Sequence, residues 1–276
     1  MPLDPYRLLN LDLPVRRYTY EDREPMLYAL AVGADAADLG FVYERDLKVI
    51  PSFVQVAGYD DSWLGAGGID LQHVVHGSLD IEFFDCFDAA GVAEIRTKIA
   101  GLSDKGEGRG GIVHQLLEIS QRGRPVANSL SSLFVRGAGG FGGDRGRQPD
   151  GVAMPEGEPH AVVEVGTAAN QAALFRLLGD RNPLHIDPAF ARAAGFETPI
   201  LHGAATFGVA CLTVLKTFCG GEPGRMKRFA VRFSGPVFPG ETLVFSFWQT
   251  ATEIRFRASA KERNAPVLDG GRTTIG

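Results

Sequence analysis

The residues best suited to chemistry lie in one short stretch, Gly179 to Pro188, where an acid, an amide and an imidazole fall within six positions. They are Asp180, Asn182 and His185. The glycine before them and Pro183 among them disfavour a plain helix, so the three side chains should share one turn. A water held between a carboxylate and an imidazole can give a proton to one while the other supplies one, as water addition or elimination requires. From the residues alone, the alternative is a capping aspartate and an exposed histidine on an ordinary loop.

A second feature follows at His202-Gly203, which precede an apolar stretch over 204–218 with few charges. This stretch predicts a buried helix. A glycine at the start of such a helix lets a ligand oxygen approach a free backbone N–H, and the helix dipole favours negative charge there. The pair therefore indicates a place for an anion-like oxygen, with an ordinary helix entry as the alternative.

The whole chain has an ordinary globular composition: 276 residues, 45% apolar, 22% charged, with a formal net charge of −5. This excess of acid argues against a nucleic-acid partner. Cys86, Cys211 and Cys219 form no C-x-x-C pair, which favours a reducing compartment, and we expect all three in the core. The sequence shows neither an apolar run of about 18 residues nor a signal-peptide core. We therefore expect a cytoplasmic protein with no membrane partner.

Apolar spacing predicts one early helix followed by a sheet in the first half. Helical spacing over 26–31 ends at Gly33, and Phe41-Val42-Tyr43 begins an extended piece. Alternating stretches predict strands over 78–84, 92–102, 112–121 and 125–135, with a turn at 104–111. This combination is typical of an α+β unit.

The second half repeats this plan. The predicted elements are a strand over 161–165, a helix ending at Gly179, a helical turn over 189–194, the buried helix, and strands over 228–234, 242–249 and 253–260. Both halves carry a His-Gly pair, at His76-Gly77 and His202-Gly203, but a strand follows the first pair directly. We infer a duplicated unit whose first copy has its central helix reduced or lost, which would leave a groove for a long ligand.

These patterns divide the chain into an N-terminal unit over 1–136, a Gly-rich linker over 137–157 and a C-terminal unit over 158–276. The linker contains Gly137 to Gly142, which matches G-x-G-x-x-G, but the residues after it cannot form the helix that a nucleotide loop needs. A flexible crossover is favoured instead. His73 and His76 have no partnering cluster of Glu or Cys, so we expect no metal site.

The stretch over 175–185 (FRLLGDRNPLH) resembles the hydratase 2 motif of MaoC-like (R)-specific enoyl-CoA hydratases. Residues 200–208 (ILHGAATFG) and 232–243 (RFSGPVFPGETL) are similar to two further signatures of that family. The similarity covers nearly the whole chain and resembles the full-length form, also found as a module of peroxisomal multifunctional enzymes. Leu178 stands where the family usually has a small residue and Phe175 where Tyr is common, which should affect substrate and rate more than the reaction.

The resemblance implies a double hot-dog fold of the α+β class, in which each unit is a long helix wrapped by a curved antiparallel sheet. It implies that the N-terminal unit is non-catalytic and accommodates bulky acyl chains. It also implies that Asp180 and His185 activate the water, that Asn182 helps to position them, and that the Gly203 N–H is the oxyanion donor. The other predicted contacts with substrate or CoA are Lys105, Gly106, His202, Arg232 and Phe233.

The expected reaction is reversible syn addition of water to a trans-2-enoyl-CoA, which gives a (3R)-3-hydroxyacyl-CoA without a metal or redox cofactor. The resemblance further suggests a homodimer. Three alternatives stay open: a dehydratase acting on carrier-protein thioesters, a hot-dog thioesterase, and a binding protein for acyl-CoA without turnover.

Overall fold

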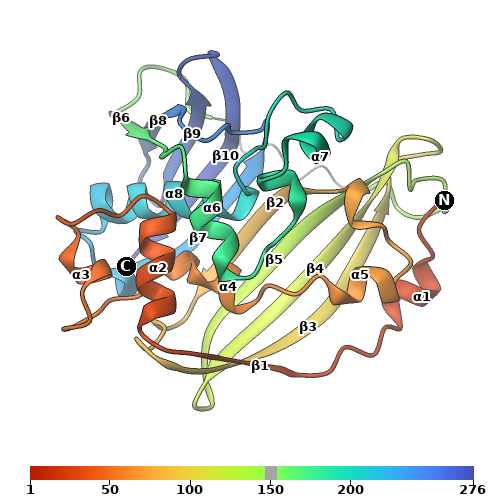
Figure 1. Ribbon diagram of the computed structural model, residues 1–276, viewed down its shortest axis with the longest axis horizontal. Helices are drawn as coiled ribbons and strands as arrows, with labels where there is room; N and C mark the ends of the chain where they lie inside the picture. The colour runs from red at the N-terminus through yellow and green to blue at the C-terminus, as the bar shows by residue number, and fades with distance from the viewer. Residues whose placement is uncertain (147–153) are drawn as a thin grey trace.

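The computed structural model describes residues 1–146 and 154–276 (Figure 1). Within them, ten strands form one antiparallel sheet in the order β1-β3-β4-β5-β2-β7-β10-β9-β8-β6. The strands are β1 (Arg16–Tyr20), β2 (Val74–Phe83), β3 (Gly91–Asp104), β4 (Gly110–Gln121), β5 (Arg124–Arg136), β6 (Ala161–Gly166), β7 (Met226–Phe233), β8 (Thr242–Gln249), β9 (Ile254–Ala260) and β10 (Ala265–Ile275). The α-helices are α1 (Pro5–Leu9), α2 (Arg23–Ala31), α3 (Leu39–Val42), α4 (Val54–Ala57), α5 (Ser62–Ala66), α6 (Gln171–Phe175), α7 (Pro188–Ala193) and α8 (Gly203–Phe218). The 3₁₀ turns are η1 (Pro51–Phe53), η2 (Leu71–His73), η3 (Arg176–Leu178), η4 (Pro183–His185) and η5 (Pro223–Arg225).

The two halves of the sheet follow the same strand order. In the first half the order from the edge inward is β1-β3-β4-β5-β2, and in the second it is β6-β8-β9-β10-β7. The innermost strands pair antiparallel, from Ser78 opposite Arg232 to Glu82 opposite Arg228. The duplication expected from the sequence is therefore confirmed, and the architecture is a double hot-dog whose two sheets form one continuous surface.

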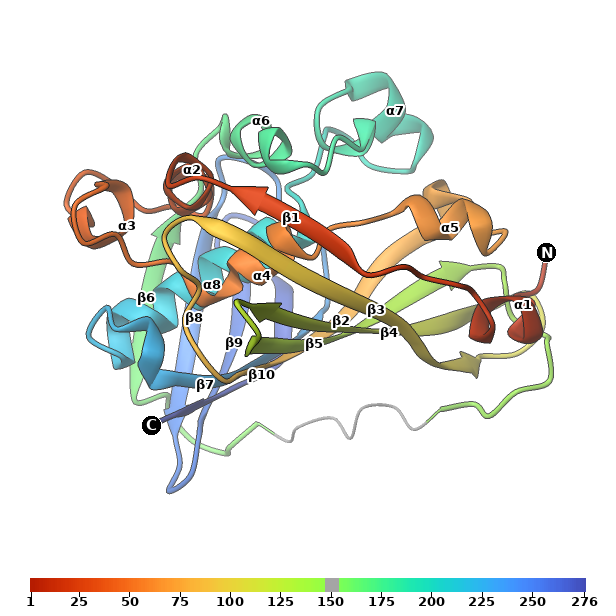
Figure 2. The same cartoon turned by 90° about the horizontal axis from the view of Figure 1, so that it is seen from below.

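Helix α8 is the apolar centre of the second half, and Figure 2 shows it enclosed by the curved sheet. Its residues from Ala205 to Leu215 are all buried, and Phe207 packs edge-on against Phe229 of β7 with ring centroids 5.0 Å apart. The helix ends where Gly220 and Gly221 adopt φ of 62° and 74°, and the Gly221 N–H then donates to the Leu215 carbonyl over 3.0 Å. Glycine adopts this left-handed backbone without a steric penalty, so the sequence stops the helix at this point.

The first half has no comparable helix among its described residues. Between β1 and β2 its longest helix is α2, with nine residues, and the helices that line the cavity, α4 and α5, have four and five. The expectation that the central helix is reduced is confirmed. The two His-Gly pairs, however, are not equivalent positions, because His76 lies within β2 whereas His202 precedes α8.

Two smaller expectations were wrong. Phe41 belongs to the short helix α3 rather than to an extended piece, since the Phe41 N–H donates to the Asp38 carbonyl over 2.8 Å and closes a turn. Cys86 is half-buried beside η5 instead of lying in the core, whereas Cys211 and Cys219 are buried as expected. Within residues 1–146 and 154–276, no helix is long and apolar enough to span a bilayer.

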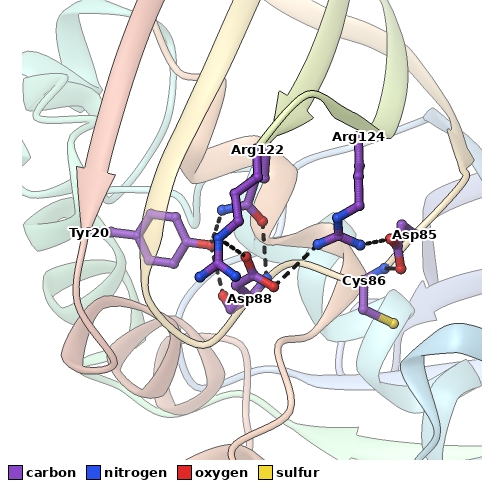
Figure 3. Close-up of polar contacts among 7 residues, drawn as sticks. Tyr20, Asp85, Cys86, Asp88, Arg122 and Arg124 are labelled. Atoms are coloured by element: carbon purple, nitrogen blue, oxygen red, sulfur yellow. Dashed lines mark hydrogen bonds and ion pairs between the residues drawn. The ribbon is translucent and has the colours of Figure 1, made fainter.

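Near the β4–β5 hairpin, a buried polar network connects the end of the sheet to the loop that contains Asp88 (Figure 3). The Gln121 side chain donates to the Tyr20 hydroxyl over 2.9 Å and accepts from the Asp88 N–H over 3.0 Å. The Tyr20 hydroxyl donates onward to the Asp88 carbonyl over 2.8 Å. Burial raises the pKa of Tyr20 to about 12, so the phenol stays protonated and keeps this bond.

Replacing Gln121 with leucine should lower the free energy of unfolding by about 1–3 kcal/mol, because the Asp88 N–H would lose its acceptor. Urea denaturation would measure the change. Arg122→Gln is the matched control, since the Arg122 side chain is 74% exposed and contacts Asp88 only as an ion pair of 3.4 Å. That control should shift stability by at most about 1 kcal/mol. Equal stability of the two variants would contradict a structural role for the network.

Candidate active site

A cavity of about 440 Å³ lies between the two halves of the molecule. Its walls come from α4, α5, β2, β4 and β5 on one side, and from the segment over 175–185 and the start of α8 on the other. Five of the predicted site residues line it: Asp180, Asn182, His185, Gly203 and Phe233. The catalytic turn and the helix start singled out by the sequence therefore meet at one cavity, although their roles stay predictions.

The turn that carries these groups is shaped by its own sequence. Gly179 has φ of 133°, a backbone conformation that favours glycine. The Asn182 N–H donates to Asp180 Oδ1 over 3.1 Å, and Asn182 Oδ1 accepts from the Leu184 N–H over 3.0 Å at the start of η4. Asn182 thus caps η4 while its backbone holds the carboxylate, which agrees with the positioning role implied by the family.

His185 is held in one tautomer. Its Nδ1 lies 2.8 Å from the Ile200 carbonyl oxygen, and a carbonyl only accepts, so Nδ1 carries the hydrogen. Burial lowers the pKa of His185, although the nearby Asp180 carboxylate opposes the shift. The imidazole is therefore neutral near pH 7, and its Nε2 keeps a lone pair that can accept a proton.

His202 lies behind this pair and does not line the cavity. Its ring stacks on His185 with centroids 3.7 Å apart, and its Nε2 donates to the Asp180 carbonyl over 3.1 Å. The side chain is fully buried, which lowers the pKa of His202 to about 2 and keeps the ring neutral. The structure thus makes His202 a support for the turn instead of the substrate contact expected from the sequence.

Among residues 1–146 and 154–276, one group of side chains comes close enough to suggest metal ligands. Asp180, His185 and His202 offer ligand atoms within 4.8 Å of one another. An imidazole binds a metal through an in-plane lone pair. The two rings are stacked at 28°, and each already donates one nitrogen to a carbonyl, so their remaining lone pairs do not converge well on one ion. The geometry fits proton transfer better than metal binding, and the expected lack of a metal stays a prediction.

The predicted oxyanion donor is bordered by a residue from each half of the chain. A Cβ added to Gly203 would lie 3.6 Å from the Phe233 ring and 3.7 Å from His76 Cβ. The Gly203 N–H makes no hydrogen bond within the described part of the chain, as expected for the first residue of a helix. His76 and Phe233 meet edge to face with centroids 5.9 Å apart, so the first half supplies part of the wall around this donor.

Tyr59 is a site residue that the sequence analysis missed. Its hydroxyl lies 3.0 Å from Asp61 Oδ2 and 3.3 Å from Asp180 Oδ1, so one hydrogen is shared between two carboxylates. Burial and these negative charges raise the pKa of Tyr59 and keep the hydroxyl protonated as a donor. Tyr59 follows α4, 121 residues before Asp180, and no local pattern links the two positions.

Three other predicted substrate contacts lie away from the cavity. Lys105 Nζ donates to the Arg145 carbonyl over 2.6 Å, and the Gly106 N–H donates to Asp104 Oδ1 over 2.8 Å. Arg232 pairs with Asp269 on the neighbouring strand β10. The structure therefore does not bring Lys105, Gly106 or Arg232 to the reacting groups.

The first part of the Gly-rich linker is attached to the N-terminal unit. The N–H groups of Gly140 and Gly142 donate to the Asp104 carboxylate over 2.7 and 2.8 Å. Backbone donors from these and neighbouring glycines lower the pKa of Asp104. This carboxylate occupies the amides that a nucleotide phosphate would need, which supports the rejection of a nucleotide loop. The rest of the predicted linker includes residues 147–153, which lie outside the described residues.

The two departures from the family motif both border the cavity. Leu178 is 8% exposed and Phe175 is 3% exposed, and Phe175 packs on His202 with ring centroids 4.8 Å apart. They contribute apolar surface beside the catalytic turn without displacing Asp180 or His185 from the cavity wall.

Comparison with known proteins assigns both halves of the chain. Residues 18–137 match the family model of the MFE-2 hydratase 2 N-terminal domain, and residues 151–270 match that of the MaoC like domain. A "Probable enoyl-CoA hydratase 2" from Dictyostelium discoideum is 34% identical, over 100% of this chain and 97% of that protein. A "3-hydroxyacyl-thioester dehydratase Y" from Mycobacterium tuberculosis is 38% identical, over 98% of each protein.

A solved structure supports the same assignment. The MaoC-like dehydratase from Phytophthora capsici is 33% identical and has a TM-score of 0.88, with 98% of each chain covered. The similarity thus extends over both units. This chain belongs to the MaoC-like hydratase 2 family in its full-length, double hot-dog form.

Proposed function

We propose that this protein catalyses reversible addition of water to trans-2-enoyl-CoA, with (3R)-3-hydroxyacyl-CoA as the product. The observation that carries the proposal is the full-length similarity to an enoyl-CoA hydratase 2, combined with a carboxylate, a neutral imidazole and a free helix N–H around one cavity. The dehydratase named among the relatives catalyses, by that name, the reverse direction of the same chemistry.

In the proposed mechanism, the substrate binds with its thioester carbonyl oxygen at the Gly203 N–H. The N–H and the dipole of α8 stabilise the enolate-like charge that builds up as water attacks C3. Asp180 and His185 hold the attacking water between them, and His185 Nε2 is free to accept a proton. The pair removes one proton from the water and delivers one to C2, so the water adds across the double bond without a net change in protons.

The family resemblance and the walls of the cavity support the specific roles. Asn182 and His202 hold the turn from two sides, through the Leu184 N–H and the Asp180 carbonyl. Tyr59 brings a donor from the first half to the same carboxylate. The homodimer, the cytoplasmic location and the lack of any cofactor stay predictions from the sequence.

The first test is loss of enoyl-thioester absorbance with crotonyl-CoA and with a long-chain enoyl-CoA, followed by chiral resolution of the product. We expect turnover to the 3R product on at least one of them. Exclusive 3S product, or release of free CoA thiol without hydration, would contradict the proposal, and thiol release would indicate a thioesterase. A strong preference for carrier-protein thioesters over CoA thioesters would instead indicate a carrier-protein dehydratase.

A further inference from the structure

The floor of the cavity carries polar side chains where an acyl pocket would ordinarily be apolar. Gln115 on β4 and Ser131 on β5 lie directly opposite each other, and both line the cavity. Gln115 is 7% exposed and Ser131 is 5% exposed. Neither side chain makes a hydrogen bond to any residue within 1–146 or 154–276.

A third polar group lies on the same side of the cavity. Gln55 on α4 also lines the cavity, and its amide nitrogen donates to the Ser129 hydroxyl over 3.4 Å, which leaves its amide oxygen free. We call Gln55, Gln115 and Ser131 the polar belt. Its surroundings are apolar, with Leu117 and Leu133 beside it on the same strands.

The fold does not require polar residues at the positions of the polar belt. In the second half, the equivalent strands β9 and β10 contribute Phe256 and Leu268, which are fully buried in the same hydrophobic core as the residues of α8. In the first half the short helices α4 and α5 leave a cavity over β4 and β5. Buried polar groups nearly always have a hydrogen-bond partner, so the belt requires water or a polar ligand group.

The strand register places the belt relative to the reacting groups. His76, which borders Gly203, pairs with Leu133 on β5, and Leu133 pairs with Val113 on β4. Gln115 is thus two strands away from His76 and displaced by two residues along the strand direction. Ordinary strand spacing makes the separation of the two positions roughly 12 Å. An acyl group that extends along the cavity from Gly203 would bring carbons several positions beyond C3 to the belt.

We propose that the polar belt selects enoyl-CoA substrates whose acyl group carries a neutral oxygen, a hydroxyl or a ketone, several carbons beyond the reacting double bond. This inference rests on the proposed hydratase function. The ligand group is neutral because the belt itself contains no charged side chain. The charged side chains Asp60, Asp61, Asp180 and Arg136 line the same cavity outside the belt. An unsubstituted chain would displace water from the belt and leave its amides and hydroxyl unpaired.

The test compares kcat/KM for an unsubstituted trans-2-decenoyl-CoA with that for analogues carrying one hydroxyl or ketone at successive positions from C6 to C9. We expect the best analogue to exceed the plain chain by at least about tenfold in the wild-type protein. Gln115→Leu should abolish or reverse that preference, and Ser131→Ala should weaken it. Gln72→Leu is the matched control, because Gln72 is exposed and does not line the cavity, and it should leave the ratio unchanged.

Equal kcat/KM across the series, or a ratio unaffected by both Gln115→Leu and Ser131→Ala, would overturn the inference while leaving the hydratase function intact. Absence of hydration on every substrate would overturn the proposed function instead. In that event, the selectivity of the belt is tested by binding alone, from calorimetric Kd values for saturated decanoyl-CoA and its hydroxylated analogues. Equal Kd values would overturn the selectivity as well, whereas tighter binding of an analogue that is lost in Gln115→Leu would support it.

Discussion

Replacing Asp180 with asparagine should lower kcat for enoyl-CoA hydration by roughly 10²–10⁴-fold. The amide oxygen of asparagine can still accept from the Asn182 N–H and from the Tyr59 hydroxyl, so the turn should keep its shape. The amide cannot accept the proton of the attacking water, however, and the pair with His185 loses its acid–base function. Steady-state kinetics would show the loss in kcat, with a much smaller change in KM.

Asp187→Asn provides the matched control for this variant. Asp187 lies on the same segment, and its side chain caps α7 by accepting from the Ala189 and Phe190 N–H groups. Asparagine caps helices about as well as aspartate, so this variant should retain both stability and activity. If Asp180→Asn worked as fast as Asp187→Asn, the carboxylate of Asp180 would not take part in the chemistry.

Gly203→Pro should lower kcat/KM by roughly 10²–10³-fold, the usual effect of removing one oxyanion donor. Proline lacks the N–H, and its ring carbon takes the place of the hydrogen. The fold should tolerate the change, because Gly203 is the first residue of α8 and His202 before it has φ of −56° and ψ of 138°. Proline is favoured at the first helical position, and an extended residue before it is compatible with its ring.

Gly203→Ala separates the loss of the donor from the addition of a side chain. Its Cβ would make ordinary contacts of 3.6 Å to the Phe233 ring and 3.7 Å to His76 Cβ, and its N–H remains. We expect this variant to keep most of the activity. Both variants would be compared by kcat/KM and by urea denaturation. If the Gly203→Pro protein is folded and nearly as active as Gly203→Ala, the Gly203 N–H is not the donor to the thioester oxygen.

The catalytic turn and the long helix could be predicted from the sequence because local rules determine them. Gly179 and Pro183 fix the turn, and the apolar stretch over 204–218 has no alternative but burial. Strands with clear alternation, such as β4 and β5, were predicted to within two residues at each end for the same reason.

The elements that were missed depend on contacts between distant segments. β10 contains Gly270 and Gly271, which weaken any local preference for a strand, but it is paired on both sides by β7 and β9. β1 is a five-residue edge strand with two arginines, and its pairing with β3 determines it. Tyr59 and the polar belt were missed for a related reason: their chemistry depends on which wall of a cavity they reach, and that follows only from the complete sheet.

The pairing of β2 with β7 has a consequence for the symmetry of the molecule. In a symmetric dimer of identical chains, every substitution appears in both subunits, so a helix removed from one subunit is removed from the other. Here the two units have the same strand order but are encoded separately and joined in one sheet. One unit can therefore keep the 16-residue α8, while the other has only short helices on its side of the cavity. Two units joined in one chain can thus differ in structure in a way that two identical chains cannot.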